Sequence, residues 1–420
     1  MKFFIIFFTL LSISLSAQDF KKTGLIHLNK LSSNEFYGRG YVKNGYELAI
    51  KYVEAEFDKL GLQKISDSYR QPFSYPVNTF PDTVQLAIDE KILVPGESFL
   101  VLPESGSAYG NFDVRYLTMS DFYTKNRDKT FFSANEVVVV APLSPKLGRD
   151  TVQYINDLLQ KINANNPIIE LTSSKLTWSV GKTCSKNARI QLTEKYFEPS
   201  AKQIKINVQN KLNEKFESYN LIAIQKAKKK KSKDYLIITA HLDHLGMMGS
   251  TATFNGANDN ASGVSMLLTL ADYYSKHPLK RKNIVFIAFG GEEAGLIGSK
   301  YFVDHPLIDL KKIKFLMNID LMGNGEDGIT VVNATKFAKE FENLKNINNQ
   351  KNYLKLVKPR GEAANSDHYW FTKNDVPSFF IYTLGGTTAY HDIYDRAEQL
   401  PMTEFDDICK LIIDFFSQLK

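Results

Sequence analysis

The chain has 420 residues, of which 43% are hydrophobic and 23% are charged, with a formal net charge of +6. This balance excludes a disordered or collagen-like chain, and the length allows one large core or two smaller ones. No segment recurs with a period of about 20 to 50 residues, which argues against a solenoid.

The first residues have the pattern of a signal peptide. Lys2 precedes a nearly unbroken apolar run at 3–15, and the small residues Ser16 and Ala17 follow it. The run is too short for a membrane span and leads into polar residues, so we predict a signal peptide at 1–17. The protein is then exported, either periplasmic or secreted, with no stable membrane span after signal removal. An uncleaved membrane anchor is the alternative.

The next segments predict a helix and then a β-rich region. Apolar residues recur at helical spacing over 45–60, and Gly61 supplies the stop. Short β-branched and aromatic runs follow, and one helical pattern interrupts them at 151–162. The runs expected to be strands are 83–88, 98–102 and 136–140.

The second half alternates buried strands with amphipathic helices. Continuous apolar strands are expected at 235–239, 283–289 and 314–319, and a last helix begins with Thr403 as its cap. This alternation predicts an α/β fold with a largely parallel mixed sheet flanked by helices. We therefore expect a discontinuous catalytic domain at 18–85 and 215–420, and a β-rich inserted domain at 86–214.

A lysine-rich run and two cysteines lie outside this pattern. The lysines at 226–233 stand between apolar strands at 219–224 and 235–239, which predicts a solvated hairpin tip. No aromatic residues interleave with them, so we expect no nucleic-acid partner. Cys409 falls on the apolar stripe of the last helix, which favours a buried thiol over a disulfide with Cys184. The oligomeric state is open.

Acids and histidines cluster where the predicted strands end. His241 and Asp243 follow the first strand, Glu292 and Glu293 the second, and Asp320 the third. Since a buried carboxylate is costly unless paired or bound to metal, converging strand ends would demand a cation. A pair of divalent metal ions meets that demand.

Two further residues fit a two-metal site. Asp259 lies just before a predicted helix and could bridge two metals about 3.5–4 Å apart. His391 follows the predicted strand at 377–382 and could supply a nitrogen ligand. The sequence 260–262 also matches a glycosylation sequon, but its place at the start of a core helix makes it a false positive.

Six ordered pieces carry a family resemblance. The chain resembles the di-zinc exopeptidase family that includes bacterial leucyl aminopeptidases and the glutamate carboxypeptidase-like proteins. The matching pieces are His241-Leu242-Asp243, the segment 256–263, the segment 289–299, Asn318-Ile319-Asp320, Ser366-Asp367-His368 and Tyr390-His391. The segment 38–40 also resembles the family's amino-terminal part.

The resemblance implies a two-zinc aminopeptidase. One zinc ion would be held by His241, Asp259 and Asp320, and the other by Asp259, Glu293 and His391. Glu292 would be the general base that activates a metal-bridging water. The substrates would be peptides with a free amino terminus.

Three more residues have supporting roles in this interpretation. Asp243 would hold the second nitrogen of the His241 imidazole, and Asp367 would orient its neighbours without binding metal. Tyr390 would donate a hydrogen bond to the developing oxyanion. His244 and His368 lie beside motif residues but outside the implied ligand set.

The insert and the reaction leave alternatives. The insert resembles, more faintly, the protease-associated domain, through the segments 135–140 and 166–170, and would shape access to the cleft. A glutaminyl cyclase-like transferase with one zinc, or a receptor-like relative without activity, would keep the same fold. Retention of both His241 and Asp320 argues against the first, and the complete ligand set argues against the second.

Overall fold

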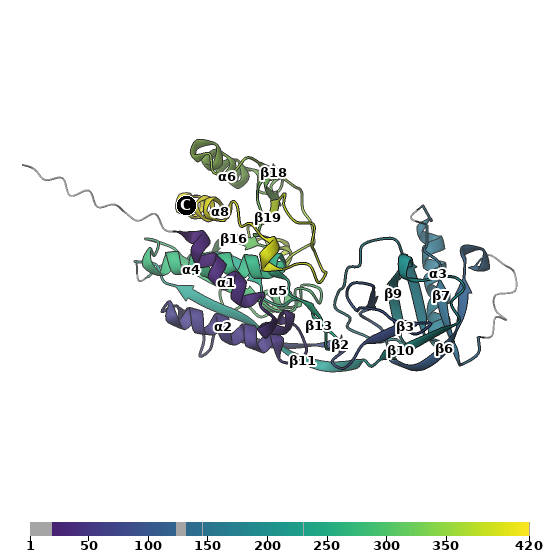
Figure 1. The fold of residues 1–420 in the computed structure, drawn as a ribbon. Coiled ribbons are helices and arrows are strands. Elements are labelled where there is room, and N and C mark those ends of the chain that lie inside the picture. The colour runs from purple at the N-terminus through teal and green to yellow at the C-terminus, as the bar shows by residue number, and fades with distance from the viewer. Residues whose placement is uncertain (1–18, 123–131, 145, 230, 420) are drawn as a thin grey trace, which may run out of the picture.

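A computed structural model describes residues 19–122, 132–144, 146–229 and 231–419. The predicted signal peptide at 1–17 lies outside these residues. Figure 1 shows a larger lobe of sheet and helices beside a smaller, mainly β lobe.

The larger lobe is built on a nine-stranded mixed sheet. Its order is β1-β11-β15-β12-β16-β19-β17-β18, and β2 pairs with β11 at one edge. The central strands β15, β12, β16 and β19 run parallel. The strand bounds are β1 Gln63–Lys64, β2 Arg70–Thr79, β11 Lys211–Gln225, β12 Tyr235–His241, β15 Asn283–Phe289, β16 Ile313–Ile319, β17 Gly328–Val332, β18 Val357–Pro359 and β19 Ser378–Leu384.

Helices cover both faces of this sheet. On one face α1, α2, α4, α6 and α8 enclose the largest hydrophobic core, which takes Leu236 and Ile238 from β12. On the other face α5 and α7 cover Ile237 of the same strand. The helix bounds are α1 Phe20–Leu31, α2 Gly45–Lys59, α4 Gly263–Lys276, α5 Ile297–Asp304, α6 Ala338–Lys351, α7 His368–Lys373 and α8 Phe405–Gln418. The central strands are therefore apolar on both sides, as parallel strands between helical layers must be.

The smaller lobe holds an eight-stranded sheet with its own core. The order is β4-β3-β10-β6-β7-β8-β9-β5, and β6, β7, β8 and β9 run parallel. The helix α3 (Arg149–Asn163) packs Ile155 and Leu159 against β7 and β8. The strand bounds are β3 Gln85–Ile88, β4 Lys91–Ile92, β5 Phe99–Val101, β6 Ala108–Leu117, β7 Glu136–Val140, β8 Ile168–Thr172, β9 Arg189–Thr193 and β10 Gln203–Val208.

Two long strands join the lobes. β2 leads out of the larger lobe and β11 leads back, paired antiparallel from Arg70↔Leu221 to Thr79↔Lys211. In Figure 1 this ribbon runs along the bottom of the molecule between the lobes. The chain thus enters and leaves the smaller lobe through neighbouring strands. A short hairpin of the larger lobe, formed by β13 (Gly246–Met248) and β14 (Ala252–Phe254), packs against the core of the smaller lobe.

Most predicted elements are confirmed, and two details are wrong. β11 and β12 do not form a hairpin, because β15 lies between them in the sheet. The lysine-rich segment is therefore a crossing between non-adjacent strands, and its backbone bonds instead to residues 279 and 280. Thr403 does not cap α8, since its hydroxyl donates to Glu326 and the N-cap residue is Glu404.

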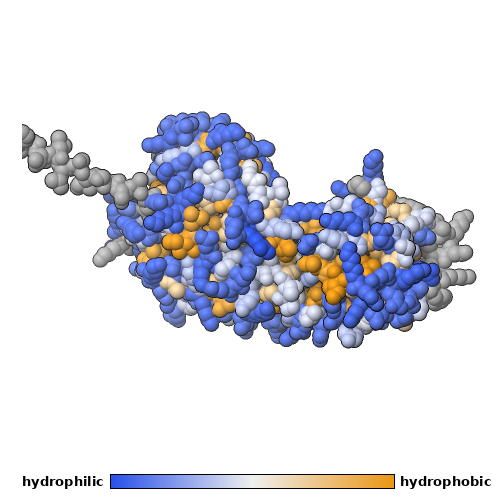
Figure 2. All heavy atoms as spheres, in the orientation of Figure 1, coloured by the Kyte–Doolittle hydropathy of each residue, from blue (hydrophilic) through white to orange (hydrophobic). Residues whose placement is uncertain are grey.

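The two cysteines differ in their exposure to solvent. Cys409 is fully buried in α8 as predicted, whereas Cys184 is exposed. On the face drawn in Figure 2, hydrophilic residues cover most of the larger lobe, and hydrophobic patches show on the smaller lobe and at the junction. Within the described segments, none of the helices combines the length and apolar character needed to cross a bilayer.

Candidate metal centre

The predicted site residues meet at one edge of the large sheet. His241 is the last residue of β12, Glu293 follows β15 by four residues, and Asp320 follows β16 directly. Since these strands run parallel, their carboxyl ends share an edge. Asp259 lies in the turn Ala257–Ser262 before α4, and His391 lies in the loop after β19.

The first cluster joins His241, Asp259 and Asp320. The Nε2 atom of His241 lies 3.1 Å from Oδ1 of Asp259 and 3.4 Å from Oδ2 of Asp320. All three residues are buried, and Oδ1 of Asp320 has no hydrogen-bond partner among the described residues. These atoms face one small volume that a cation would fill.

The second cluster joins the other oxygen of Asp259 to Glu293 and His391. The Nε2 atom of His391 lies 3.0 Å from Oδ2 of Asp259 and 3.1 Å from Oε2 of Glu293. His244 is also close, with Nδ1 2.7 Å from Oε1 of Glu293. His244 also groups with Asp259 and Glu293 as a possible metal cluster. It is His391, however, whose Nε2 lies within 3.1 Å of both carboxylates, which makes His391 the stronger candidate ligand and leaves His244 to hold Glu293.

The donor atoms fit zinc. Ligands about 2.0–2.1 Å from a tetrahedral zinc ion lie about 3.3–3.4 Å from one another. The separations of 3.0–3.4 Å in both clusters are close to that value. Each cluster offers one imidazole and two carboxylates, a donor set that zinc accepts.

The pKa values show how strongly negative this edge is. Burial alone would lower the pKa of His241, but the charges of Asp320 and Glu292 outweigh it and raise that pKa well above its ordinary value. Against the same effect of burial, Glu293 and Asp259 raise the pKa of His391 to about 11. Burial raises the pKa of Asp320 to about 6. The excess negative charge therefore needs protons or metal ions to balance it.

Glu292 and Tyr390 border the same pocket. It has a volume of about 230 Å³, and Leu321, Asn365, Phe380 and Tyr382 line it together with the candidate ligands. Burial raises the pKa of Glu292 well above its ordinary value. Tyr390 is half-exposed, and its ring stacks on that of His391 at 4.0 Å. A buried carboxyl group and a hydroxyl thus border the two clusters.

Asp243 lies at the site but differs from its prediction. The main-chain carbonyl of Asp243, not its carboxylate, accepts from Nδ1 of His241 at 3.0 Å, and the carboxylate is 3.9 Å away. The carboxylate instead accepts the N–H groups of Glu292 and Glu293, both at 3.2 Å. It therefore holds the turn after β15.

Asp367 and His368 lie under the site at the start of α7. Both are fully buried. Burial raises the pKa of Asp367 to about 7, and it lowers the pKa of His368 to about 4. Asp367 is close enough to His241 for their charges to interact, and its orienting role stays a prediction.

Sequence reasoning missed two residues that hold the ligands. Arg39 is fully buried, and its guanidinium donates to five carbonyl oxygens, among them those of Leu242 and Asp259. The carboxylate of Asp395 accepts the N–H groups of Asn258 at 2.8 Å and Asp259 at 3.0 Å. Arg39 lies in the segment 38–40, which resembles the family's amino-terminal part, but nothing in the sequence indicates that its guanidinium bonds to main-chain carbonyl groups.

The sequon at Asn260 lies inside the protein. The Asn260 side chain is fully buried, donates to the carbonyl of Ile319 and accepts the N–H of Gly263. A glycan has no room there, in agreement with the interpretation as a false positive.

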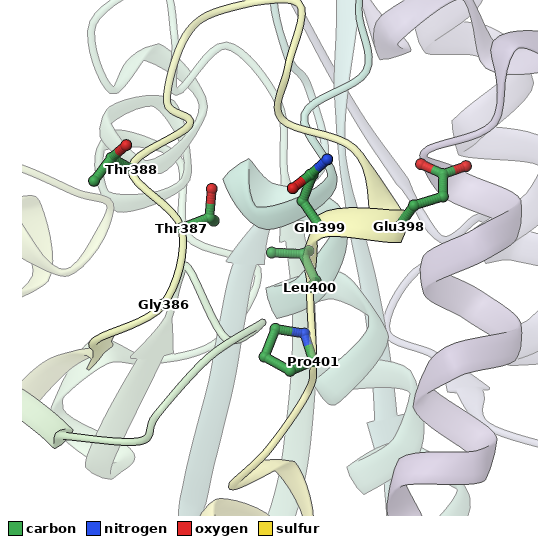
Figure 3. A pocket seen from close by; sticks show the side chains of 7 residues that line it. All are labelled: Gly386, Thr387, Thr388, Glu398, Gln399, Leu400 and Pro401. Atoms are coloured by element: carbon green, nitrogen blue, oxygen red, sulfur yellow. The ribbon is translucent and has the colours of Figure 1, made fainter.

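A larger pocket nearby lacks the chemistry of a metal site. It has a volume of about 610 Å³ and lies between the segments 386–388 and 398–401. Figure 3 shows its seven lining residues, of which Glu398 is the one that carries a charge. The donor atoms, and not the pocket size, therefore identify the candidate centre.

Comparisons with known proteins show which family and folds this chain resembles. Residues 220–416 match the model of peptidase family M28. Aminopeptidase YwaD of Bacillus subtilis (strain 168) is 42% identical over 107 residues, which cover 25% of this chain and 22% of that protein. A probable leucine aminopeptidase of Trichophyton verrucosum (strain HKI 0517) is 29% identical over 227 residues, or 50% of this chain and 58% of that protein. The chain thus spans less than two thirds of the length of these curated relatives.

Two solved structures resemble the whole molecule. An aminopeptidase from Aneurinibacillus sp. strain AM-1 aligns with a TM-score of 0.65 at 20% identity, over 95% of this chain and 93% of that chain. BSAP, a zinc aminopeptidase from Bacillus subtilis, aligns with a TM-score of 0.69 at 19% identity, over 93% and 94% of the two chains. The predicted α/β fold is confirmed.

Proposed function

Since the segment 220–416 matches the model of peptidase family M28, we propose that this chain is an exported aminopeptidase that uses two zinc ions. It would hydrolyse the amino-terminal peptide bond of peptides. The position of Asp259 carries the proposal, because its two oxygens face two separate sets of histidine and carboxylate donors. The relatives named above are aminopeptidases, which supports the same reaction.

The contacts support one ligand set for each ion. His241, Asp259 and Asp320 would hold one ion, and Asp259, Glu293 and His391 would hold the other. Two zinc ions held there would polarise a carbonyl oxygen and lower the pKa of water. Their charge would also balance the carboxylates at this edge of the sheet.

Glu292 is the residue that would move protons. It borders the pocket without belonging to either cluster, and burial raises its pKa. A carboxylate with a raised pKa can take a proton from the attacking water and give it to the leaving amine. The Tyr390 hydroxyl would donate a hydrogen bond to the oxyanion of the reacting carbonyl.

The pocket supports a substrate that enters by its amino end. Glu292 is the pocket carboxylate that neither ligand set uses, so its charge would remain to attract a free ammonium group. Leu321, Phe380 and Tyr382 supply apolar surface beside it. A peptide with a free amino terminus combines both features.

The domain limits and the export of the chain belong to the same proposal. We place the catalytic domain at 18–85 and 215–420 and the insert at 86–214. The strands of the second sheet, from Gln85 to Val208, support these limits. Export rests on the signal-peptide pattern at 1–17, and the final location would be periplasmic or extracellular.

Hydrolysis of aminoacyl-anilides by the purified protein tests the reaction. We expect cleavage of substrates with a free amino group, none of their acetylated counterparts, loss of activity on chelation, and recovery with Zn²⁺. Elemental analysis should give two zinc ions per chain. A single zinc ion together with cyclisation of amino-terminal glutamine would favour the transferase instead, and inactivity on all free-amino substrates would refute the proposal.

A further inference from the structure

A loop of the small lobe bonds directly to one candidate ligand. The loop 173–188 joins β8 to β9, and its residue Trp178 pairs with His391 through main-chain atoms. The N–H of Trp178 donates to the carbonyl of His391 at 2.8 Å, and Nδ1 of His391 lies 3.0 Å from the carbonyl oxygen of Trp178. A carbonyl only accepts, so Nδ1 donates to Trp178 and Nε2 is the nitrogen that faces Asp259 and Glu293.

The Trp178 side chain fixes this main chain in place. Its ring stacks on Phe254 of the large lobe at 4.7 Å, and its indole N–H donates to the carbonyl of Val101 in β5 at 2.8 Å. The residue is 6% exposed. Trp178 is therefore held by both lobes at the point where it meets His391.

Lys175 forms a second link from the same loop. Its ammonium group lies 2.5 Å from Oδ2 of Asp392, whose side chain is 3% exposed. It also donates to the carbonyl oxygens of Thr388 at 2.8 Å and Tyr390 at 3.3 Å. One lysine thus ties together the three residues that surround His391 in the chain and neutralises a buried carboxylate.

His391 needs such support more than the candidate ligands at the strand ends do. His241 belongs to a buried strand, and Glu293 and Asp320 follow buried strands. His391 lies seven residues after β19, beyond Gly385 and Gly386, and has a positive φ of 53°. A non-glycine residue keeps this conformation only where its surroundings hold it.

We propose that the loop 173–188 is a positioning element of the metal centre, acting through the Trp178 main chain on His391 and through Lys175 on the segment 388–392. The inference rests on the proposed function, in which His391 holds the second zinc ion. The small lobe then does more than border the cleft, because its loop sets the affinity of one of the two metal sites.

Zinc titration of loop variants tests this role. The metal content of each purified variant is measured after equilibration with buffers of graded free zinc, which gives a dissociation constant for each site. In Lys175→Met and Trp178→Leu we expect the site that His391→Ala removes to lose about 10–100-fold in affinity while the other site is unchanged. Lys175→Arg should retain both sites, and so should the control Lys186→Met, which changes an exposed lysine of the same loop.

A double-variant comparison separates positioning from general damage. His391→Ala should bind one zinc ion, and adding Lys175→Met to it should leave the remaining site within about twofold, since independent sites add without coupling. Unchanged affinities in Lys175→Met and Trp178→Leu, or equal weakening of both sites, would overturn the inference and leave the proposed function intact. Lys175→Met alone decides the matter if Trp178→Leu does not fold. Wild-type protein without bound zinc would overturn the proposed function and the inference with it.

Discussion

Replacement of the buried Arg39 by methionine should be among the most damaging single changes outside the ligands. The Arg39 guanidinium is fully buried and donates five hydrogen bonds of 2.7–3.3 Å. The acceptors are the carbonyl oxygens of Leu31, Leu242, Asn255, Gly256 and Asp259. Burial lowers its pKa only to about 10, so the group stays charged at neutral pH.

The expected loss in the free energy of unfolding follows from the number of hydrogen bonds that Arg39 donates. At about 1 kcal/mol for each lost hydrogen bond, Arg39→Met should lower the free energy of unfolding by about 5 kcal/mol. That is a large share of the roughly 5–15 kcal/mol by which native proteins are stable. Arg39→Lys keeps the charge but has three donors, so at least two bonds and about 2 kcal/mol should be lost.

Urea denaturation in the presence of chelator measures this loss, with Arg281→Met as the control. Arg281 is an exposed arginine of the same lobe, and its replacement should change the stability by no more than about 0.5 kcal/mol. A difference below about 1 kcal/mol between Arg39→Met and Arg281→Met would refute the reasoning, because five buried carbonyl groups would then have found other partners.

Three further predictions concern the site and its surroundings. Glu292→Gln should bind two zinc ions but turn over about 100- to 10,000-fold more slowly, and metal analysis with anilide assays checks both; unchanged turnover would remove Glu292 from its role. His244→Leu should weaken zinc binding at the Glu293 site by about 10–100-fold, whereas His244→Asn keeps a donor near Nδ1 and should bind like the wild type. Equal affinities in these two variants would contradict the role given to His244. The unfolded state protonates His368 below pH 6.5 and the folded state only below about 4, so stability is lost as the pH falls between these values. Relative to His368→Leu, the wild type should lose about 3 kcal/mol over that range in urea denaturation at a series of pH values, and parallel curves would count against the buried neutral imidazole.

The strand-end residues could be predicted because the sequence carries both parts of the pattern. The apolar run at 283–289 and the acids Glu292 and Glu293 after it are adjacent in the chain. Parallel pairing of β12 with β15 and β16 then brings His241 and Asp320 to the same edge without further information. Local patterns therefore sufficed where the topology was regular.

The hairpin prediction failed because strand order is not local. The runs 219–224 and 235–239 are close in sequence, and neighbouring strands usually pair. Here β15 takes the place between β11 and β12, pairing antiparallel with one and parallel with the other. Residues more than 40 positions downstream decide this arrangement, and the lysine-rich segment itself shows nothing of it.

The supporting contacts of the ligands escaped prediction for a different reason. Asp243, Arg39 and Asp395 act on N–H and carbonyl groups of the chain, and every residue other than proline offers both. The sequence shows which side chain can form a hydrogen bond, but it does not show which main-chain group will lie within reach of that side chain in the fold. Asp243 lies two residues after His241, yet its carboxylate accepts from the amides of Glu292 and Glu293 and not from the imidazole.

The same limit explains why the small lobe was expected only to border the cleft. Trp178 touches His391 through main-chain atoms, so no residue type in the loop 173–188 signals the contact. The place at which the small lobe is inserted explains the contact between Trp178 and His391. Because β2 and β11 leave and enter the large lobe side by side, the small lobe is held next to the sheet edge where the ligands lie. His391, the candidate ligand in the loop seven residues after β19, is also the one that the neighbouring lobe reaches.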